Sequence, residues 1–293
     1  MSSGPLAPSS GSTNRDVPTL VRSGTVERAG GATYYEVHGQ GPTVLVMVGW
    51  GTYTDGAFAQ VPWAVAQGRR VVLLDWRGLG RSRDNEAIPA TTREFAADAA
   101  AVLDEVGGTP AHIVGIVGIG ACVAQWVAID RPDLTRCLAL SGGWAGPDRL
   151  FTDQMNFLLF VAENHGFAEF QRLCAQWCFD PQYYNERADQ FLGPQGPWSH
   201  LRDNLPGMRR IVAATINHDA RGQLPRITAP SFVLHADADL LTGTRLTKPL
   251  AAAIPDAKEV LIENLPHVVA GRAHKKLFSD ALGGFLALVE SAD

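Results

Sequence analysis

Short apolar runs that alternate with amphipathic stretches are the feature that most restricts how this chain can fold. The later runs are continuously apolar rather than alternating, as in "RVVLLD" (70–75) and "SFVLHA" (231–236). Continuous apolar runs are typical of strands that are buried on both faces of a parallel sheet. The pattern therefore predicts an α/β fold, in which helices cover both faces of a mostly parallel sheet.

The apolar periodicity gives a predicted order of strands and helices. Strands are predicted at 33–37, 43–48, 70–75, 112–116, 136–141, 231–236 and 258–263. Helices are predicted at 57–67, 92–106, 120–130, 244–253 and 272–290. The first two strands have no helix between them, which predicts that the sheet begins with an antiparallel pair.

The composition is that of an ordinary globular protein. Of the 293 residues, 46% are hydrophobic and 19% charged, so the chain can bury a large core. The net charge is -5 and no basic block occurs, so we expect neither nucleic acid nor a membrane as a partner. No stretch is apolar enough to span a bilayer, and the four cysteines form no C-x-x-C pair. We expect a cytoplasmic monomer or homodimer with reduced thiols, without metal or other cofactor.

Two segments depart from the alternation of strands and helices. The first 20 residues are rich in Ser, Gly and Pro, which predicts a disordered tail at 1–20. The segment 146–221 has a helical pattern and contains nearly half of the aromatic residues. We interpret it as a helical lid on a core formed by 21–145 and 222–293. Most of its aromatic residues are expected to form a small core of the lid, and some to line a pocket for a hydrophobic small molecule.

Four motifs resemble, in their order, those of the α/β-hydrolase superfamily. They are "VMVGWG" after the second predicted strand, "DWRGLGRS" after the third, "VGIVGIGA" between a strand and a helix, and "HADADLLTG" followed by "ENLPHVV". The resemblance covers about 21–293 and places the family's lid at 146–221. It implies an α/β-hydrolase fold, with a mostly parallel eight-stranded sheet flanked by helices and a helical lid insertion.

The resemblance also implies an acid and a histidine near the end of the chain. The acid position falls on Asp239, with Asp237 as the alternative, and the histidine position falls on His267, with His235 and His274 as alternatives. An aspartate bonded to an imidazole fixes its tautomer and stabilises its cation. Such a pair can act as a general base.

The position of the family's nucleophilic serine holds a residue without oxygen or sulfur. In the G-x-S-x-G frame the residue is Val117, and a shift by one residue places Gly118 there instead. The family's turn has a positive φ, which is costly for a β-branched residue. Either Val117 is strained or the turn has relaxed around Gly118. The other side chains that could supply an oxygen or sulfur are those of Cys122, Ser141, Thr52, Tyr53 and Thr54. We expect none of them to replace the nucleophile.

The backbone donors that the family uses to hold an oxyanion do not depend on the serine. The resemblance places them at the N–H groups of Trp50 and Gly118. Val48 occupies the position where the family usually has a histidine. The other candidate substrate contacts are Gly49, Val117, Trp144 and Trp177.

We expect an enzyme in which His267 and Asp239 form a general base without a covalent nucleophile. Cofactor-free dioxygenases of hydroxyquinolones are a branch of the superfamily that works in this way, with O2 as co-substrate. Lyases, decarboxylases and cyclases that act on aromatic compounds of secondary metabolism are mechanistically close. Each of these reactions removes an acidic proton from a small hydrophobic, aromatic substrate.

Two alternatives remain open at the level of sequence. His267 could activate a water molecule directly, which would make the protein a hydrolase without an acyl-enzyme. The protein could also be a non-catalytic ligand-binding protein. The N-myc downstream-regulated family has a glycine-rich, serine-free turn similar to "VGIGA", and it provides a precedent for this second alternative.

Overall fold

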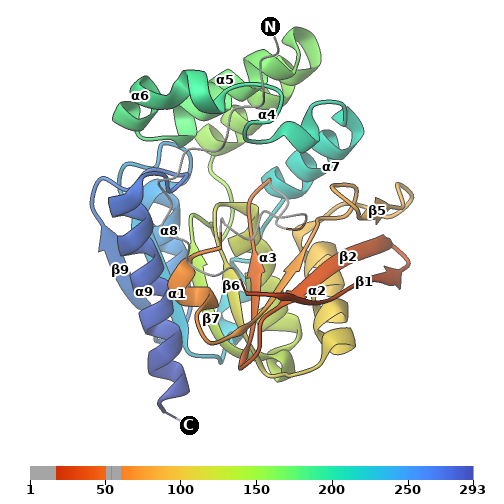
Figure 1. Cartoon of the computed structure of the whole chain (residues 1–293), viewed down its shortest axis with the longest axis vertical. Helices are drawn as coiled ribbons and strands as arrows, with labels where there is room; N and C mark the ends of the chain where they lie inside the picture. Colours follow the sequence, from red (N-terminus) through yellow and green to blue (C-terminus); the bar gives the residue numbers. More distant parts are fainter. Residues whose placement is uncertain (1–17, 51–53, 55–60, 293) are drawn as a thin grey trace, which may run out of the picture.

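The structure is a computed structural model that describes residues 18–50, 54 and 61–292. Residues 51–53 and 55–60 and most of the tail predicted at 1–20 lie outside the described residues. One sheet with helices on both faces forms the body of the molecule, and a group of helices lies over one end of it (Figure 1). The predicted α/β fold is confirmed.

The described residues form nine strands in one sheet. They are β1 (Leu20–Arg28), β2 (Gly31–His38), β3 (Thr43–Met47), β4 (Arg70–Leu74), β5 (Arg83–Asp84), β6 (Ala111–Gly115), β7 (Thr135–Ser141), β8 (Ser231–Ala236) and β9 (Lys258–Ile262). Eight of them follow the order β1-β2-β4-β3-β6-β7-β8-β9, and the two-residue β5 pairs with β2. From β4 to β9 all neighbours are parallel. β2 pairs antiparallel with β1 and with β4.

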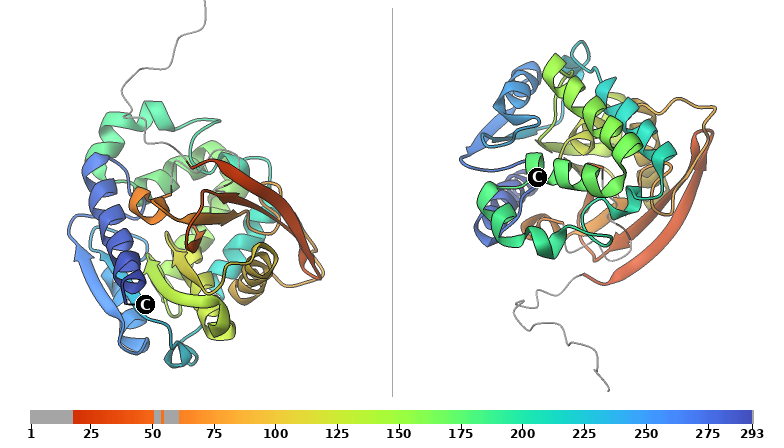
Figure 2. Two further views of the ribbon diagram at one scale, coloured as in Figure 1. Left: turned by 60° about the horizontal axis from the view of Figure 1, so that its bottom comes forward. Right: turned by 90° about the horizontal axis from the view of Figure 1, so that it is seen from above.

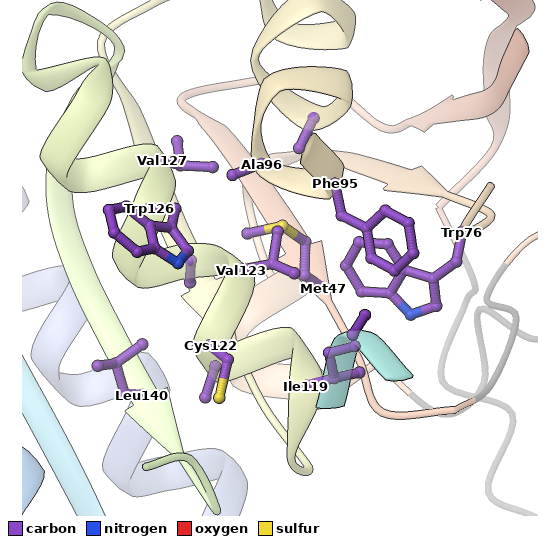
Figure 3. Packing of buried hydrophobic residues seen from close by; sticks show 14 of the residues in the cluster. Met47, Trp76, Phe95, Ala96, Ile119, Cys122, Val123, Trp126, Val127 and Leu140 are labelled. Carbon is purple, nitrogen blue, oxygen red and sulfur yellow. The ribbon is translucent and has the colours of Figure 1, made fainter. Parts of the chain in front are cut away.

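The helices of the core pack on the two faces of this sheet. They are α1 (Trp63–Ala66), α2 (Thr92–Val106), α3 (Ile119–Asp130), α8 (Gly243–Ala253) and α9 (Arg272–Glu290). Buried residues of α2, α3 and α8 belong to one hydrophobic cluster, and those of α1 and α9 to a second. Figure 3 shows part of the first cluster, between α3 and neighbouring elements.

The two clusters explain why the strand sequences are continuously apolar. In β3, Leu45 and Met47 belong to the cluster with α2 and α3, whereas Val44 and Val46 belong to the cluster with α1 and α9. Successive side chains of a strand point to opposite faces, and here both faces are covered by helices. Each residue of the strand is therefore buried, whichever way it points.

The start of the sheet differs from the sequence prediction. β1 was not predicted, because its residues are mostly exposed and carry no clear alternation. The antiparallel start is correct, but the two strands predicted as a pair, now β2 and β3, are not neighbours, since β4 lies between them. The helix predicted at 57–67 is present as α1, which begins after Pro62. The part of that prediction at 57–60 lies outside the described residues.

The segment predicted as a lid contains four helices. They are α4 (Arg149–His165), α5 (Phe167–Cys178), α6 (Pro181–Phe191) and α7 (Leu205–Ile216). They lie together above one end of the sheet, as the view from above shows (Figure 2, right). Asp148 caps α4 by accepting a hydrogen bond from the backbone N–H of Phe151 at 2.7 Å, which satisfies a free donor at the helix start.

Candidate active site

The turn between β6 and α3 is centred on Val117. Val117 has a φ of 58°, and Gly118, which precedes the first residue of α3, has a φ of 82°. A positive φ is rare for a β-branched residue and costs roughly 1–3 kcal/mol. Of the two arrangements that the sequence allowed, the structure has the strained Val117. The turn keeps the backbone shape that the resemblance implied, with valine at its apex.

Small residues let this turn approach the neighbouring backbone closely. A Cβ on Gly115 would lie 2.4 Å from the carbonyl oxygen of Gly120. A Cβ on Gly120 would lie 2.5 Å from the carbonyl oxygen of Met47. The close approach after the turn is therefore made at Gly120, one residue later than the G-x-S-x-G frame places it. Ile119 stands where the G-x-S-x-G frame has its second glycine, and it lines the cavity described below.

Asp239 and His267 are hydrogen-bonded to each other. Asp239 lies in the loop after β8, and His267 lies in the loop after β9, and the His267 Nδ1 to Asp239 Oδ2 distance is 2.8 Å. The other oxygen of Asp239 accepts from the backbone N–H groups of Leu241 and Thr242 at 2.8 and 2.9 Å. The Thr242 hydroxyl donates to Oδ2 at 2.6 Å. The carboxylate is thus fixed by four donors and holds the imidazole in one orientation.

The two groups shift each other's pKa. Burial raises the pKa of Asp239, but the charge of His267 and the hydrogen bonds from His267 and Thr242 outweigh it and bring the pKa to about 2. Burial lowers the pKa of His267, but the charge and hydrogen bond of Asp239, with a smaller effect of Cys178, raise it to about 9. Opposite charges at hydrogen-bond distance favour the charged form of both groups. The resting pair at neutral pH is therefore an ion pair.

The alternatives to this pair have other partners. Asp237 accepts a hydrogen bond from the backbone N–H of Asn264 at 2.6 Å and so joins the loops after β8 and β9. His235 is buried between Thr247, at 2.7 Å, and Glu259, at 2.9 Å. His274 lies in α9. Neither histidine lines the cavity that His267 lines.

The other described nucleophile candidates do not line the cavity that His267 lines. Cys122 is fully buried, and burial raises the pKa of its thiol well above the ordinary value. Ser141, at the end of β7, is buried and does not line the cavity. Thr54 donates to the carboxylate of Asp75 at 2.7 Å, whereas Thr52 and Tyr53 lie outside the described residues.

One cavity collects most of the predicted site residues at the boundary between core and lid helices. From the core it is lined by Gly49, Trp50, Val117, Gly118, Trp144 and His267. A Cβ on Gly118 would lie 3.9 Å from His267 Nε2, so the turn faces the free nitrogen of the imidazole. Among the described residues, no backbone acceptor receives the N–H of Trp50 or of Gly118. Asp239 lies behind His267 and does not line the cavity.

The lid helices contribute apolar and sulfur-containing side chains to the same cavity. Sequence reasoning did not single these out as site residues; they include Met155 and Leu158 of α4, Cys174 and Cys178 of α5, and Thr215 of α7. The spacing of the two cysteines, one helical turn apart, was the available signal, since it places both on one face of α5. That face turns out to be the one toward the cavity.

Trp177, predicted as a substrate contact, lies outside the cavity that holds the other predicted contacts. Trp177 does not line the cavity, and its ring packs against Phe157 at 6.4 Å between centroids. Trp177 is next to Cys178 in α5, and successive side chains of a helix point about 100° apart. Of the aromatic residues of the lid segment, Phe151 and Trp198 do line it.

Most aromatic residues of the lid segment pack on one another instead. Phe179 stacks on Phe191 at 4.7 Å and on Tyr183 at 5.7 Å between ring centroids. Trp198 meets Phe170 edge-on at 6.3 Å. This is the small core that the high aromatic content predicted.

Two absences hold for the described part of the chain. No helix there is long and apolar enough to cross a membrane. No group of three or more His, Cys, Asp and Glu side chains there is arranged to hold a metal ion.

Comparison with known proteins places this site in a family. A family model described as the alpha/beta hydrolase fold matches residues 42–270. A protein of Azorhizobium caulinodans that carries the name of the carbamate hydrolase RutD is 27% identical over 264 residues, which cover 88% of this chain and 96% of that protein. Rhodomycin D methylesterase DnrP of Streptomyces peucetius is 28% identical over 250 residues, which cover 73% of this chain and 80% of that protein.

A solved structure shows the same fold. MGS-M2, an α/β hydrolase enzyme from a Medee basin deep-sea metagenome library, has a TM-score of 0.76 at 20% sequence identity. The match covers 90% of this chain and 97% of that one. The family model spans more than half of the chain, and the strands from β3 to β9, the turn at Val117 and the Asp239–His267 pair lie within it. The chain belongs to the α/β hydrolase fold family.

Proposed function

We propose that this protein is an enzyme that hydrolyses small uncharged acyl compounds, with water as the nucleophile and His267 as its general base. One observation carries the proposal: His267, fixed by Asp239, faces a turn whose apex is Val117. The turn offers backbone N–H groups to a reacting carbonyl, whereas the valine side chain offers it no nucleophile. A water molecule beside Nε2 takes the place of the serine hydroxyl.

The proposed reaction transfers one proton twice. The reaction starts from the fraction of the protein in which the imidazole of His267 is neutral. There Asp239 keeps the imidazole proton on Nδ1, so the lone pair of Nε2 accepts a proton as the water oxygen attacks the carbonyl carbon. The electron pair of the C=O bond moves to the carbonyl oxygen, which accepts hydrogen bonds from the N–H groups of Trp50 and Gly118. The intermediate then collapses, the bond to the leaving group breaks, and the proton on Nε2 passes to that group.

The lining of the cavity supports an uncharged substrate. Among the described residues that line it, His267 has the only basic side chain and none has a carboxylate. A charged group away from the reacting carbonyl would lose its water without gaining a partner, which is costly. The cavity has a volume of about 60 Å³ among the described residues, which favours small esters, lactones or carbamate esters.

The relatives support hydrolysis over the reaction that we expected first. The carbamate hydrolase and the methylesterase both cleave acyl bonds by name, and neither name refers to oxygenation, lyase, decarboxylase or cyclase chemistry. The oxygenase-like reaction is the second candidate, because the same pair in an apolar cavity can remove a proton from an enolisable aromatic compound. Oxygen consumption with such compounds distinguishes it from hydrolysis.

The proposal predicts hydrolysis without an acyl-enzyme, and measurements of turnover and of acyl adducts test it. Short p-nitrophenyl esters, small lactones and methyl carbamates serve as substrates, and mass spectrometry of the quenched protein detects any acyl adduct. We expect turnover by the unmodified protein without an adduct, loss of turnover in His267→Ala, and unchanged turnover in the control His274→Ala. Val117→Ser is expected to give an acylated protein.

Three outcomes would contradict the proposal. An acyl adduct on the unmodified protein would reveal a covalent nucleophile. Full turnover in His267→Ala would remove the general base from the mechanism. Absence of turnover with every substrate class, together with tight binding of an apolar ligand, would favour the non-catalytic alternative.

A further inference from the structure

The peptide unit between Gly49 and Trp50 is held by a side chain from another part of the core. The indole N–H of Trp76 donates to the carbonyl oxygen of Gly49 at 2.8 Å. Trp76 belongs to the "DWRGLGRS" turn after β4, and its side chain is 3% exposed. An indole has a single polar group, so this hydrogen bond uses the whole hydrogen-bonding capacity of the side chain.

The ring of Trp76 is itself fixed. It stacks on Phe95 of α2 at 5.7 Å between centroids, with an angle of 21° between the planes. Figure 3 shows the two rings side by side within the buried cluster. The direction of the indole N–H is therefore set by core packing rather than by a movable side chain.

The bonded carbonyl belongs to the same peptide unit as the N–H of Trp50. A peptide unit is planar, and its C=O and N–H point in opposite directions. A donor that fixes the carbonyl of Gly49 therefore also fixes the direction of the Trp50 N–H. A carbonyl that accepts a hydrogen bond also polarises the N–H of its own unit, which strengthens the bond that this N–H donates.

The other contacts of Trp50 act on different atoms. His200 donates from Nε2 to the carbonyl oxygen of Trp50 at 2.6 Å, on the next peptide unit. The indole of Trp50 donates to Thr215 Oγ1 at 2.9 Å, and the Thr215 hydroxyl donates in turn to the carbonyl of Ile211 at 2.7 Å. These bonds hold the residue from the side of the lid. Trp76 is the side chain that holds the donor peptide itself.

We propose that Trp76 is a positioning residue for the oxyanion donor at Trp50. This rests on the proposed function, in which the Trp50 N–H receives the developing charge. Without the indole N–H the peptide between Gly49 and Trp50 can tilt, and its N–H is both misdirected and less polarised. The loss acts on the transition state, where the carbonyl oxygen is charged, and less on the ground state.

The test replaces the indole N–H with the least change in shape. The variants are Trp76→Phe and the replacement of Trp76 by benzothienylalanine, which keeps the bicyclic ring and has sulfur in place of N–H. Removal of a whole oxyanion donor costs roughly 10²–10³-fold in kcat, so we expect about a tenfold fall for a misdirected donor, with KM changed by less than about twofold. The matched control is Trp126→Phe, a buried tryptophan of α3 outside the cavity, for which we expect unchanged kcat.

A second measurement is independent of activity. In amide NMR spectra we expect the proton resonance of Trp50 to move upfield in both variants at position 76, because its peptide is no longer polarised, and to stay in place in Trp126→Phe. An unchanged Trp50 resonance together with unchanged kcat in the benzothienylalanine protein would overturn the proposal. If the unmodified protein hydrolyses nothing, the proposed function fails, whereas the Trp50 resonance still decides whether Trp76 orients this peptide.

Discussion

The two halves of the cavity wall are built on different principles. On the core side, His267 is held by Asp239, whose carboxylate accepts hydrogen bonds from four donors. On the lid side, the wall consists mainly of apolar and sulfur-containing side chains, such as Leu158, Met155 and Cys174. The lid also bonds to a loop of the site, since the carbonyl of Cys178 accepts from the backbone N–H of Val268 at 2.8 Å.

This difference predicts that residues of the core side determine the reaction, whereas residues of the lid side determine which substrates fit. A hydrogen-bonded group must keep its direction, so the loss of one partner on the core side affects the reaction directly. An apolar wall contributes through shape and volume, so changes there alter stability and the size of the preferred substrate. We therefore expect core and lid substitutions to differ in which quantity they change.

The largest effect is expected at the histidine. His267→Gln removes the base and keeps a side chain of similar polarity, and we expect kcat/KM to fall by about 10²–10⁴-fold. Steady-state kinetics with the best ester substrate measures this. A fall of less than about threefold would show that the core side does not carry the reaction.

The pH dependence is expected to be the next largest effect. The pKa of His267 is raised to about 9, and only the neutral imidazole accepts a proton. We expect kcat/KM to rise about tenfold per pH unit up to about pH 9 and then to level off. In Asp239→Asn the cause of the shift is removed, so the rise should end at a lower pH. A profile that is flat between pH 6 and 9 would contradict this role of His267.

The same pair makes stability depend on pH. A raised pKa in the folded state means that the stabilisation from His267 is complete below its ordinary pKa of 6.5 and is lost as the pH rises to about 9. The lowered pKa of Asp239 means that its stabilisation is complete above 3.8 and is lost as the pH falls toward 2. The temperature of thermal unfolding, measured between about pH 2 and about pH 9, checks this dependence. Asp239→Asn is the comparison.

A lid substitution is expected to change stability more than catalysis. Leu158 of α4 is 1% exposed, and Leu158→Ala should lower the free energy of unfolding by about 2–5 kcal/mol. We expect kcat for the smallest ester to change by less than about threefold, and the preference to move toward longer acyl chains. Leu150→Ala, on the exposed side of the same helix, is the control and should change neither quantity. A large fall in kcat with unchanged substrate preference would contradict the expected difference between the core side and the lid side of the cavity wall.

The smallest effect is expected at the strained turn. Val117→Gly loses about 1.5–3 kcal/mol of side-chain burial at most but relieves about 1–3 kcal/mol of backbone strain. We expect the free energy of unfolding to change by about 1 kcal/mol or less, measured by urea unfolding. Val114→Gly in β6 has no strain to relieve and should cost about 2–5 kcal/mol. Equal losses in the two variants would mean that Val117 is not strained.

The sequence alone determined the layered α/β fold and the pairing of an acid with a histidine. Burial on both faces makes strand sequences such as 70–75 continuously apolar, and this signal is local. Asp239 and His267 were predicted from the resemblance of their motifs to those of the α/β-hydrolase superfamily. They meet because each follows a strand of a parallel sheet, and the carboxyl ends of such strands meet at one edge. The exposed β1 carried no such signal and was missed.

Only the tertiary structure decided which side chains face each other across the cavity. The centring of the turn on Val117 depends on close contacts of Gly115 and Gly120 with other parts of the backbone. The cavity wall contains Cys174 and Cys178 and not the predicted Trp177. This depends on how α5 is rotated over the core. The bond from Trp76 to Gly49 joins two loops that are separate in sequence. Local patterns record how deeply a residue is buried, whereas these features depend on which distant segment covers it.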